Sequence, residues 1–191
     1  AGLLADTGVD GLEINLFASP KEPRMNAALI ENEQVDLITD LKKTVSIPIS
    51  VKLSSFYTNV LNLICRMDYA GSDAFVLFNK LFEPDIDLAK GELVSPFTFS
   101  SETDSRLPLH YATLLEGAVK ADICCSTGIM DGEQAVKMIL AGATTVQVVS
   151  ALYRHGVSHI HAILEDIKKW MDTNGHADLA CFRGKLSKRH V

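Results

Sequence analysis

Short apolar runs alternate with amphipathic segments along most of the chain, and this alternation limits the possible folds more than any other feature. It is clearest in ADICCSTGIMDGEQAVKMILAGATTVQVVSAL, from Ala121 to Leu152. ADICCS is typical of a strand, and the apolar residues between Gly132 and Ala141 recur at helical spacing. Thr144 to Val149 is again strand-like, because it is rich in β-branched residues. This stretch therefore predicts a strand, a tight turn, a helix, a second strand and the start of another helix.

The same rhythm runs through the rest of the chain. The predicted strands are Val9–Leu16, Ile47–Leu53, Ala74–Phe78, Ala121–Ser126 and Thr144–Val149, and the predicted helices are Asn32–Val45, Asn59–Tyr69, Leu107–Lys120, Gly132–Ala141 and Ser158–Thr173. Strands that alternate with helices favour a parallel α/β sheet. Five strands that end in a phosphate-binding pair fit strands four to eight of a TIM (β/α)8 barrel. A doubly wound open sheet is the alternative, although no GxGxxG pattern follows any strand.

The rhythm breaks between Leu81 and Ser101, where no helical pattern follows the third strand. FEPDIDLAKGELVSPFTFS instead predicts a short hairpin that turns at Lys90-Gly91. An insertion at this end of a barrel strand usually covers the active site, so we expect a lid. Its carboxylates fit a lid surface better than acid/base catalysts; they are Glu83, Asp85 and Asp87.

The chain opens AGLLADTGVDGLEINL, without an initiator methionine and partway along a helical pattern. We therefore expect residues 1–191 to be the C-terminal portion of a single barrel domain whose first strands are not in this chain.

Composition excludes several classes of function. The formal net charge is −6, and the only basic run is Lys185 to His190, which argues against nucleic-acid binding. No apolar run approaches the ~20 residues of a membrane span, so we expect no membrane segment in this chain. The cysteines, at positions 65, 124, 125 and 181, show no CxxC spacing and favour free thiols in a reducing, cytoplasmic setting. His155 and His159 are four residues apart without an evident third ligand, so no metal site is predicted.

Polar residues lie where the predicted strands end, and in a barrel these ends face the active site. Lys52 would place an ammonium group in the mouth, where it can stabilise an oxyanion or the N1–O2 edge of a reduced flavin. Asn15 and Asn79 carry amides that can bind a planar ring with carbonyl and N–H groups. A surface lysine and turn asparagines are the alternatives for each residue alone, and their joint placement favours a site.

A second group of residues predicts a phosphate pocket. Thr127, Gly128 and Ile129 form the turn after one strand, and Ser150 and Ala151 begin a helix after the next. Two adjacent βα turns of this kind, late in a parallel barrel, form the usual phosphate site.

VDGLEINL, PISVKLSSF, AFVLFNK and the STGIMDGEQAVKMILAGATTVQVVSAL block together resemble the dihydroorotate dehydrogenase family, the FMN-dependent (β/α)8 barrels. The resemblance covers nearly the whole chain and is closest to the dihydroorotate dehydrogenase-like subgroup, through its WMDTNG and FRGKLS pieces. It implies that Asn15 contacts flavin and substrate, Lys52 lies at the flavin ring, and Asn79 holds the substrate's pyrimidine ring. It also implies that the FMN phosphate is bound by Thr127, Gly128, Ile129, Ser150 and Ala151.

The loop after the first strand departs from the family. The family reads roughly Asn-x-Ser-Cys-Pro-Asn, or has Ser in place of Cys, whereas this chain reads Asn15-Leu16-Phe17-Ala18-Ser19-Pro20-Lys21. Ser19 thereby becomes the candidate catalytic base, and its hydroxyl would need activation by water or a proton relay.

The resemblance implies an FMN-dependent oxidoreductase, acting on CH–CH donors, that oxidises dihydroorotate to orotate in pyrimidine biosynthesis. It implies a cytoplasmic enzyme with a small-molecule substrate and a possible homodimer. A flavin-binding barrel with another substrate, or without catalysis of its own, and a phosphate-binding barrel without flavin are the alternatives.

Overall fold

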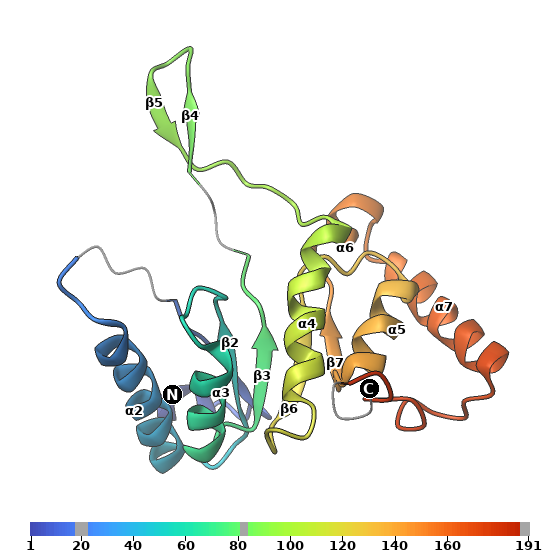
Figure 1. Ribbon diagram of the computed structural model, residues 1–191, viewed down its shortest axis with the longest axis horizontal. Coiled ribbons are helices and arrows are strands. Elements are labelled where there is room, and N and C mark those ends of the chain that lie inside the picture. Colours follow the sequence, from blue (N-terminus) through green and yellow to red (C-terminus); the bar gives the residue numbers. More distant parts are fainter. Residues whose placement is uncertain (18–22, 81–83, 188–191) are drawn as a thin grey trace.

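The computed structural model describes residues 1–17, 23–80 and 84–187. Its main feature is a five-stranded parallel sheet in the order β1-β2-β3-β6-β7 (Figure 1). The strands of this sheet are β1 (Leu12–Asn15), β2 (Ile49–Leu53), β3 (Ala74–Leu77), β6 (Asp122–Ser126) and β7 (Thr145–Gln147). The helices are α1 (Gly2–Ala5), α2 (Ala27–Thr44), α3 (Val60–Tyr69), α4 (Arg106–Leu115), α5 (Gly132–Ala141), α6 (Ser150–His155) and α7 (His159–Asn174), with a 3-10 turn η1 (Glu102–Ser105) before α4.

The strand order distinguishes a barrel from a doubly wound sheet. Apart from an inserted hairpin, neighbours in the sheet are also successive in the chain, whereas a doubly wound sheet reverses its order at a switch point. Helices α2, α3, α4 and α5 cover one face of the sheet (Figure 1). Across the other face, Gln147 on β7 donates a hydrogen bond of 2.6 Å to Glu13 on β1, so side chains of the two edge strands meet. These features confirm the predicted α/β barrel class.

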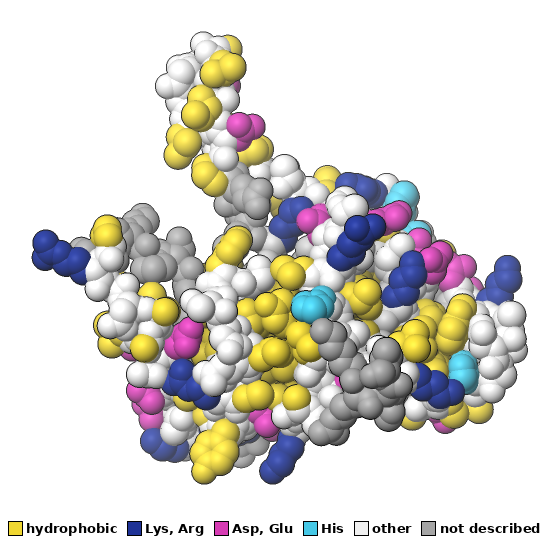
Figure 2. All heavy atoms as spheres, in the orientation of Figure 1, with side chains coloured by type: hydrophobic (Ala, Val, Ile, Leu, Met, Phe, Trp, Pro, Cys, Tyr) yellow, Lys and Arg dark blue, Asp and Glu magenta, His cyan; other side chains and the backbone are white. Residues whose placement is uncertain are grey.

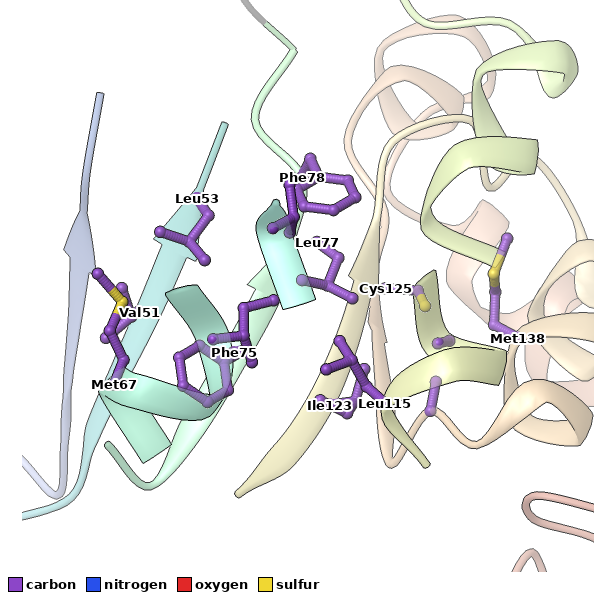
Figure 3. Packing of buried hydrophobic residues seen from close by; sticks show 14 of the residues in the cluster. Val51, Leu53, Met67, Phe75, Leu77, Phe78, Leu115, Ile123, Cys125 and Met138 are labelled. Atoms are coloured by element: carbon purple, nitrogen blue, oxygen red, sulfur yellow. The ribbon is translucent and has the colours of Figure 1, made fainter. Parts of the chain in front are cut away.

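Alternate strand residues point into a core between the sheet and its helices. Figure 3 shows Val51, Leu53, Phe75, Leu77, Ile123 and Cys125 of the strands near Met67 of α3, Leu115 of α4 and Met138 of α5. The intervening residues face the other side of the sheet, where polar side chains are frequent: Glu13, Ser50, Lys52, Thr145 and Gln147. The period of two thus places apolar residues under the helices and polar ones on the face that a barrel encloses.

Most predicted elements are confirmed, with shifted ends. Helix α2 begins at Ala27 instead of Asn32, because the Asn26 side chain caps it by accepting a hydrogen bond of 2.8 Å from a backbone N–H of its first turn. Helix α4 ends at Leu115 instead of Lys120. The strands of the parallel sheet are shorter than the apolar runs that predicted them.

The predicted hairpin is confirmed, and the lid is not. Strands β4 (Asp85–Asp87) and β5 (Glu92–Val94) pair antiparallel around Lys90-Gly91, and Asp87 accepts hydrogen bonds from the backbone of this turn. The hairpin projects away from the sheet (Figure 1) and exposes apolar side chains (Figure 2), among them Leu88 at 90%. These short strands pair only with each other in a sheet of their own, whereas Phe97, Thr98 and Ser100, later in the same insertion, line the hollow described below. That the insertion acts as a lid stays a prediction. Glu83 lies outside the described residues.

All four cysteines are free thiols, as predicted. Across the described ranges, no helix is both long enough and apolar enough to cross a membrane. That residues 1–191 form the C-terminal portion of one barrel domain stays a prediction.

Candidate active site

A hollow opens at the carboxyl ends of the parallel strands, the place where a barrel carries its active site. Lys52 of β2, residues 78–80 after β3 and the turn 127–129 after β6 line it, together with the segment 97–100 and Ser150 of α6. Its empty volume is about 760 Å³, counting space open to solvent.

Lys52 supplies a positive charge at the floor of the hollow. Its side chain is 17% exposed, and its Nζ donates a hydrogen bond of 2.8 Å to Oε1 of Gln147. The same Nζ lies 3.7 Å from Oε1 of Glu13. An ammonium group fixed in this way is suited to stabilise negative charge on a bound ligand. The predicted place of Lys52, in the mouth of the sheet, is confirmed.

Asn15 and Asn79 lie together at one side of the site. Asn15 ends β1 and Asn79 follows β3, and Nδ2 of Asn79 donates a hydrogen bond of 2.6 Å to Oδ1 of Asn15. The backbone N–H of Asn79 also donates to the carbonyl of Leu53, over 2.8 Å, which fixes its position beside β2. Each amide keeps further donor and acceptor capacity for a ligand.

The turn after β6 provides the other end of the site. Thr127 has a φ of 81°, which is uncommon for a residue with a side chain, and its Oγ1 donates to the carbonyl of Phe78 over 2.9 Å. The N–H of Gly128 points to the hydroxyl of Ser100, 3.2 Å away. Ser150 begins α6, as predicted, and its Oγ accepts hydrogen bonds from the N–H and the hydroxyl of Ser100. The side chains of Ile129 and Ala151 are buried beneath this end.

Ser100 is a residue that sequence reasoning missed. It is 6% exposed and connects the Gly128 turn to Ser150, and the Arg154 side chain donates to its carbonyl over 3.3 Å. It lies in the segment after the hairpin, where no strand or helix pattern marks a position. One signal was present: Ser101 to Asp104 has the S-x-x-D spacing of a helix start, and Ser100 immediately precedes it.

Glu13 and Gln147 were missed as well. Glu13 lies two residues before Asn15 and interrupts the apolar pattern of the first strand. Gln147 is a polar residue within the apolar run from Thr144 to Val149. A strict reading of the period of two would have placed Glu13 on the same face as Asn15, and Gln147 on the same face as Thr145.

The Gly128 turn packs tightly against η1. Gly128 has a φ of 78°, and a Cβ there would lie 2.7 Å from the carbonyl oxygen of Ser101. An ion pair of 3.0 Å between Lys80 and Asp104 joins the end of β3 to η1. Burial alone would raise the pKa of Asp104, but hydrogen bonds from Ser101 and Lys80 outweigh it and lower this pKa. Contacts on both sides therefore hold the turn in place.

Two further expectations concern Ser19, as a catalytic base, and the histidines, for which no metal site is predicted. Ser19, the candidate base, lies outside the described residues. The rings of His155 and His159 pack 4.7 Å apart, and Nε2 of His159 lies 2.8 Å from the carbonyl oxygen of Met130. Among the residues that the structure describes, no cluster of three His, Cys, Asp or Glu side chains is placed to hold a metal ion.

The donors of the hollow match a long ligand with two different ends. The ammonium of Lys52 and the two asparagine amides suit a ring that carries carbonyl and N–H groups. The N–H of Gly128 and the hydroxyls of Ser100 and Ser150 suit a phosphate. The structure thus brings the residues predicted for the ring and for the phosphate into one site.

Comparison with known proteins agrees with this site. The family model described as dihydroorotate dehydrogenase matches residues 4–171. The catalytic subunit of dihydroorotate dehydrogenase B (NAD(+)) from Geotalea uraniireducens is 30% identical over 182 residues, covering 93% of this chain and 59% of that protein. The corresponding subunit from Alkaliphilus metalliredigens is 29% identical, covering 96% of this chain and 62% of that protein. Dihydroorotate dehydrogenase A (fumarate) from Lacticaseibacillus paracasei is 30% identical, covering 79% of this chain and 53% of that protein.

The chain thus spans about three-fifths of the length of the first two of these relatives. The matching family is flavin-dependent and has the TIM-barrel fold, which fits the curved parallel sheet and the site at its carboxyl edge. Since the family model covers most of the sequence, the chain belongs to the dihydroorotate dehydrogenase family.

Proposed function

We propose that the whole protein is an FMN-dependent oxidoreductase that oxidises dihydroorotate to orotate, a step of pyrimidine biosynthesis. One observation carries the proposal: a single hollow is lined by Lys52 and Asn79 and also by Ser100, Gly128 and Ser150, and Asn15 accepts a hydrogen bond from Asn79 beside it. The first group suits the polar edges of ring systems, and the second suits a phosphate. A flavin cofactor such as FMN has both a polar ring system and a phosphate, and the matched family is flavin-dependent.

The donor set fits FMN without rearrangement of the sheet. The hydroxyl of Ser150 would donate to the phosphate, and the N–H of Gly128 and the hydroxyl of Ser100 would exchange their present hydrogen bonds, to Ser100 and to Ser150, for the phosphate oxygens. The tight turn that Thr127 and Gly128 allow would help to place them. Lys52 would hold its positive charge beside the polar edge of the ring system, where negative charge gathers on reduction. When bound, FMN would supply the acceptor for the hydride that leaves the substrate.

The asparagine pair would hold the substrate ring. Because Asn79 donates to Asn15, the second N–H of the Asn79 amide and both of its acceptor sites stay available, as does the amino group of Asn15. Two amides fixed to each other can read the alternating carbonyl and N–H groups of dihydroorotate without first losing side-chain freedom. The pair therefore orients the ring that loses the hydride.

Ser19 is proposed as the base that removes the proton. The loop from Asn15 to Lys21 contains no cysteine, and Ser19 is its only serine, directly before Pro20. A hydroxyl at this place would pass the proton to water or to a relay.

The test is the visible spectrum of the whole protein, before and after dihydroorotate is added without oxygen. We expect bound flavin whose absorbance bleaches on addition. Ser19→Ala should bind the flavin and slow the bleaching, with the largest loss at neutral pH. Protein without flavin would overturn the proposal.

The altered loop also favours a second candidate, a flavin enzyme on this scaffold with another substrate. Flavin that stays oxidised with dihydroorotate but is reduced by a different cyclic amide would favour this candidate. The relatives are named for NAD(+) and fumarate as acceptors, and mixing the reduced protein with each acceptor would show which one reoxidises it. A homodimer is proposed from the resemblance alone, and sedimentation of the whole protein tests it.

A further inference from the structure

Lys52 does not stand alone on the concave face of the sheet, because Glu13 and Gln147 hold it from two strands. Gln147 accepts a hydrogen bond from Lys52 through Oε1, over 2.8 Å, and donates one to Glu13 through Nε2, over 2.6 Å. Glu13 lies 3.7 Å from the same ammonium group. The three side chains form a closed triangle between β1, β2 and β7.

The chemistry of the two partners fixes the orientation of the Gln147 amide. A lysine ammonium only donates, and an ionised carboxylate only accepts. Rotating the amide by half a turn would place its amino group against the ammonium of Lys52 and its oxygen against the carboxylate of Glu13. Gln147 therefore has one favourable orientation, and it transmits the position of Glu13 on β1 to Lys52.

The triangle also affects the electrostatic field at the site, because Glu13 lies close to the charge of Lys52. The triangle contains one positive and one negative group, both partly withdrawn from water, with side chains that are 17% and 37% exposed. Opposite charges this close cancel much of each other's field at a distance, and the low effective dielectric of a protein interior strengthens the effect. Glu13 therefore decides how much of the Lys52 charge reaches a ligand in the hollow.

We propose that Glu13, held by Gln147, sets the effective charge of Lys52 and thereby the reduction potential of the bound FMN. Both are positioning residues, since they act through Lys52. This inference rests on the proposed function, because it needs FMN in the hollow. It goes further by assigning a role to two residues whose spacing of 134 positions in the chain gives no sign of it.

The direction of the effect follows from charge. Reduction adds negative charge to the ring system, and an uncompensated Lys52 would stabilise that charge more strongly. Glu13→Gln keeps the size of the side chain and removes its charge, so it should raise the reduction potential. Gln147→Glu adds a second negative charge beside Lys52 and should lower it.

The experiment is a redox titration of the whole protein with FMN bound, for the wild type and both variants. We expect each variant to change the ratio of reduced to oxidised flavin, at a fixed potential, by about tenfold in opposite directions, which is about 30 mV for a two-electron couple. Glu133→Gln is the matched control. It makes the same chemical change on the outer surface of α5, where Glu133 pairs with Lys137, and it should leave the potential unchanged.

The outcomes separate this inference from the proposed function. Wild-type protein that binds no FMN overturns both. A second outcome is that the variants bind FMN, show flavin bleaching with dihydroorotate and keep the wild-type reduction potential. That result overturns only the role of Glu13 and Gln147. If one variant loses FMN, the other still tests the proposal: a shift of its reduction potential in the expected direction supports it, and no shift or the opposite shift overturns it. If both lose it while the wild type keeps it, the triangle supports the site mechanically and the proposal is wrong.

Discussion

The amide of Asn79 donates a hydrogen bond of 2.6 Å to Oδ1 of Asn15, although the two residues are 64 positions apart and β2 lies between their strands. The contact forms because parallel strands end at the same edge of the sheet, so residues at these ends converge. The two amides therefore work as one unit.

The first prediction concerns this unit. Asn15→Ala and Asn79→Ala should each reduce kcat/KM for dihydroorotate by about 10- to 100-fold, through the loss of about 1–3 kcal/mol of hydrogen bonding. The double variant should lose less than the sum, with a coupling of about 0.5–3 kcal/mol, because either change alone already disrupts the pair. Steady-state kinetics on the three variants measures it, with flavin content determined first. Additive losses would show that the two amides act independently.

The fold class and the polar residues at the strand ends could be predicted from the sequence. Apolar runs with a period of two identify strands locally, and parallel pairing then brings Asn15, Lys52 and Asn79 to one edge without further information. The start of α2 was misplaced because Asn26 determines it through a cap, several residues before the amphipathic pattern becomes visible.

Contacts that cross the sheet, and contacts made by irregular segments, could not be predicted from the sequence. Gln147 meets Glu13 only because the sheet curls until its edge strands face each other, and no local pattern encodes that distance. Ser100 reaches Gly128 through a segment without regular structure. The hairpin shows the reverse case: its turn was predictable from Lys90-Gly91, but its direction depends on contacts that its own residues do not specify.

The second prediction compares two glycines. Gly128 and Gly91 both have positive φ, 78° and 66°, so alanine at either position costs about 1–2 kcal/mol of backbone strain. Only at Gly128 does a Cβ also collide with the backbone of η1, at Ser101 and its neighbours, while nothing lies within 4 Å of it at Gly91. Gly128→Ala should therefore destabilise the protein by at least about 1 kcal/mol more than Gly91→Ala, and it should lose FMN.

Denaturant unfolding of both variants and their flavin content after gel filtration provide the measurement. Gly91→Ala should keep wild-type flavin content, since the hairpin does not line the hollow. Equal stability of the two variants would show that η1 moves aside without cost.

The third prediction follows from the lowered pKa of Asp104. A carboxyl group whose pKa is lower in the folded state stabilises the fold above its unfolded pKa of about 3.9, and this contribution disappears as pH falls through the folded value. Asp104→Asn removes the charge opposite Lys80, so it should lower the free energy of unfolding at pH 7 by on the order of 1 kcal/mol or less, because both side chains stay partly solvated. The difference from wild type should close below about pH 4.

Urea unfolding from pH 7 down to pH 3 tests this, with Asp172→Asn, at an exposed site on α7, as the control. A difference that stays constant over this range would mean that Asp104 acts through the shape of its hydrogen bonds and not through its charge.

The fourth prediction concerns the thiols. Cys65 and Cys181 are exposed, whereas Cys124 and Cys125 are buried on β6, and burial raises the pKa of both of these thiols. Because the thiolate is the reactive form, Cys65 and Cys181 should react quickly with a maleimide under native conditions, and the β6 pair should react only after unfolding. Mass spectrometry of the labelled protein would count the modified sites over time. With Cys65→Ser and Cys181→Ser combined, fast labelling should vanish, and any that persisted would mean that β6 opens to solvent in the native state.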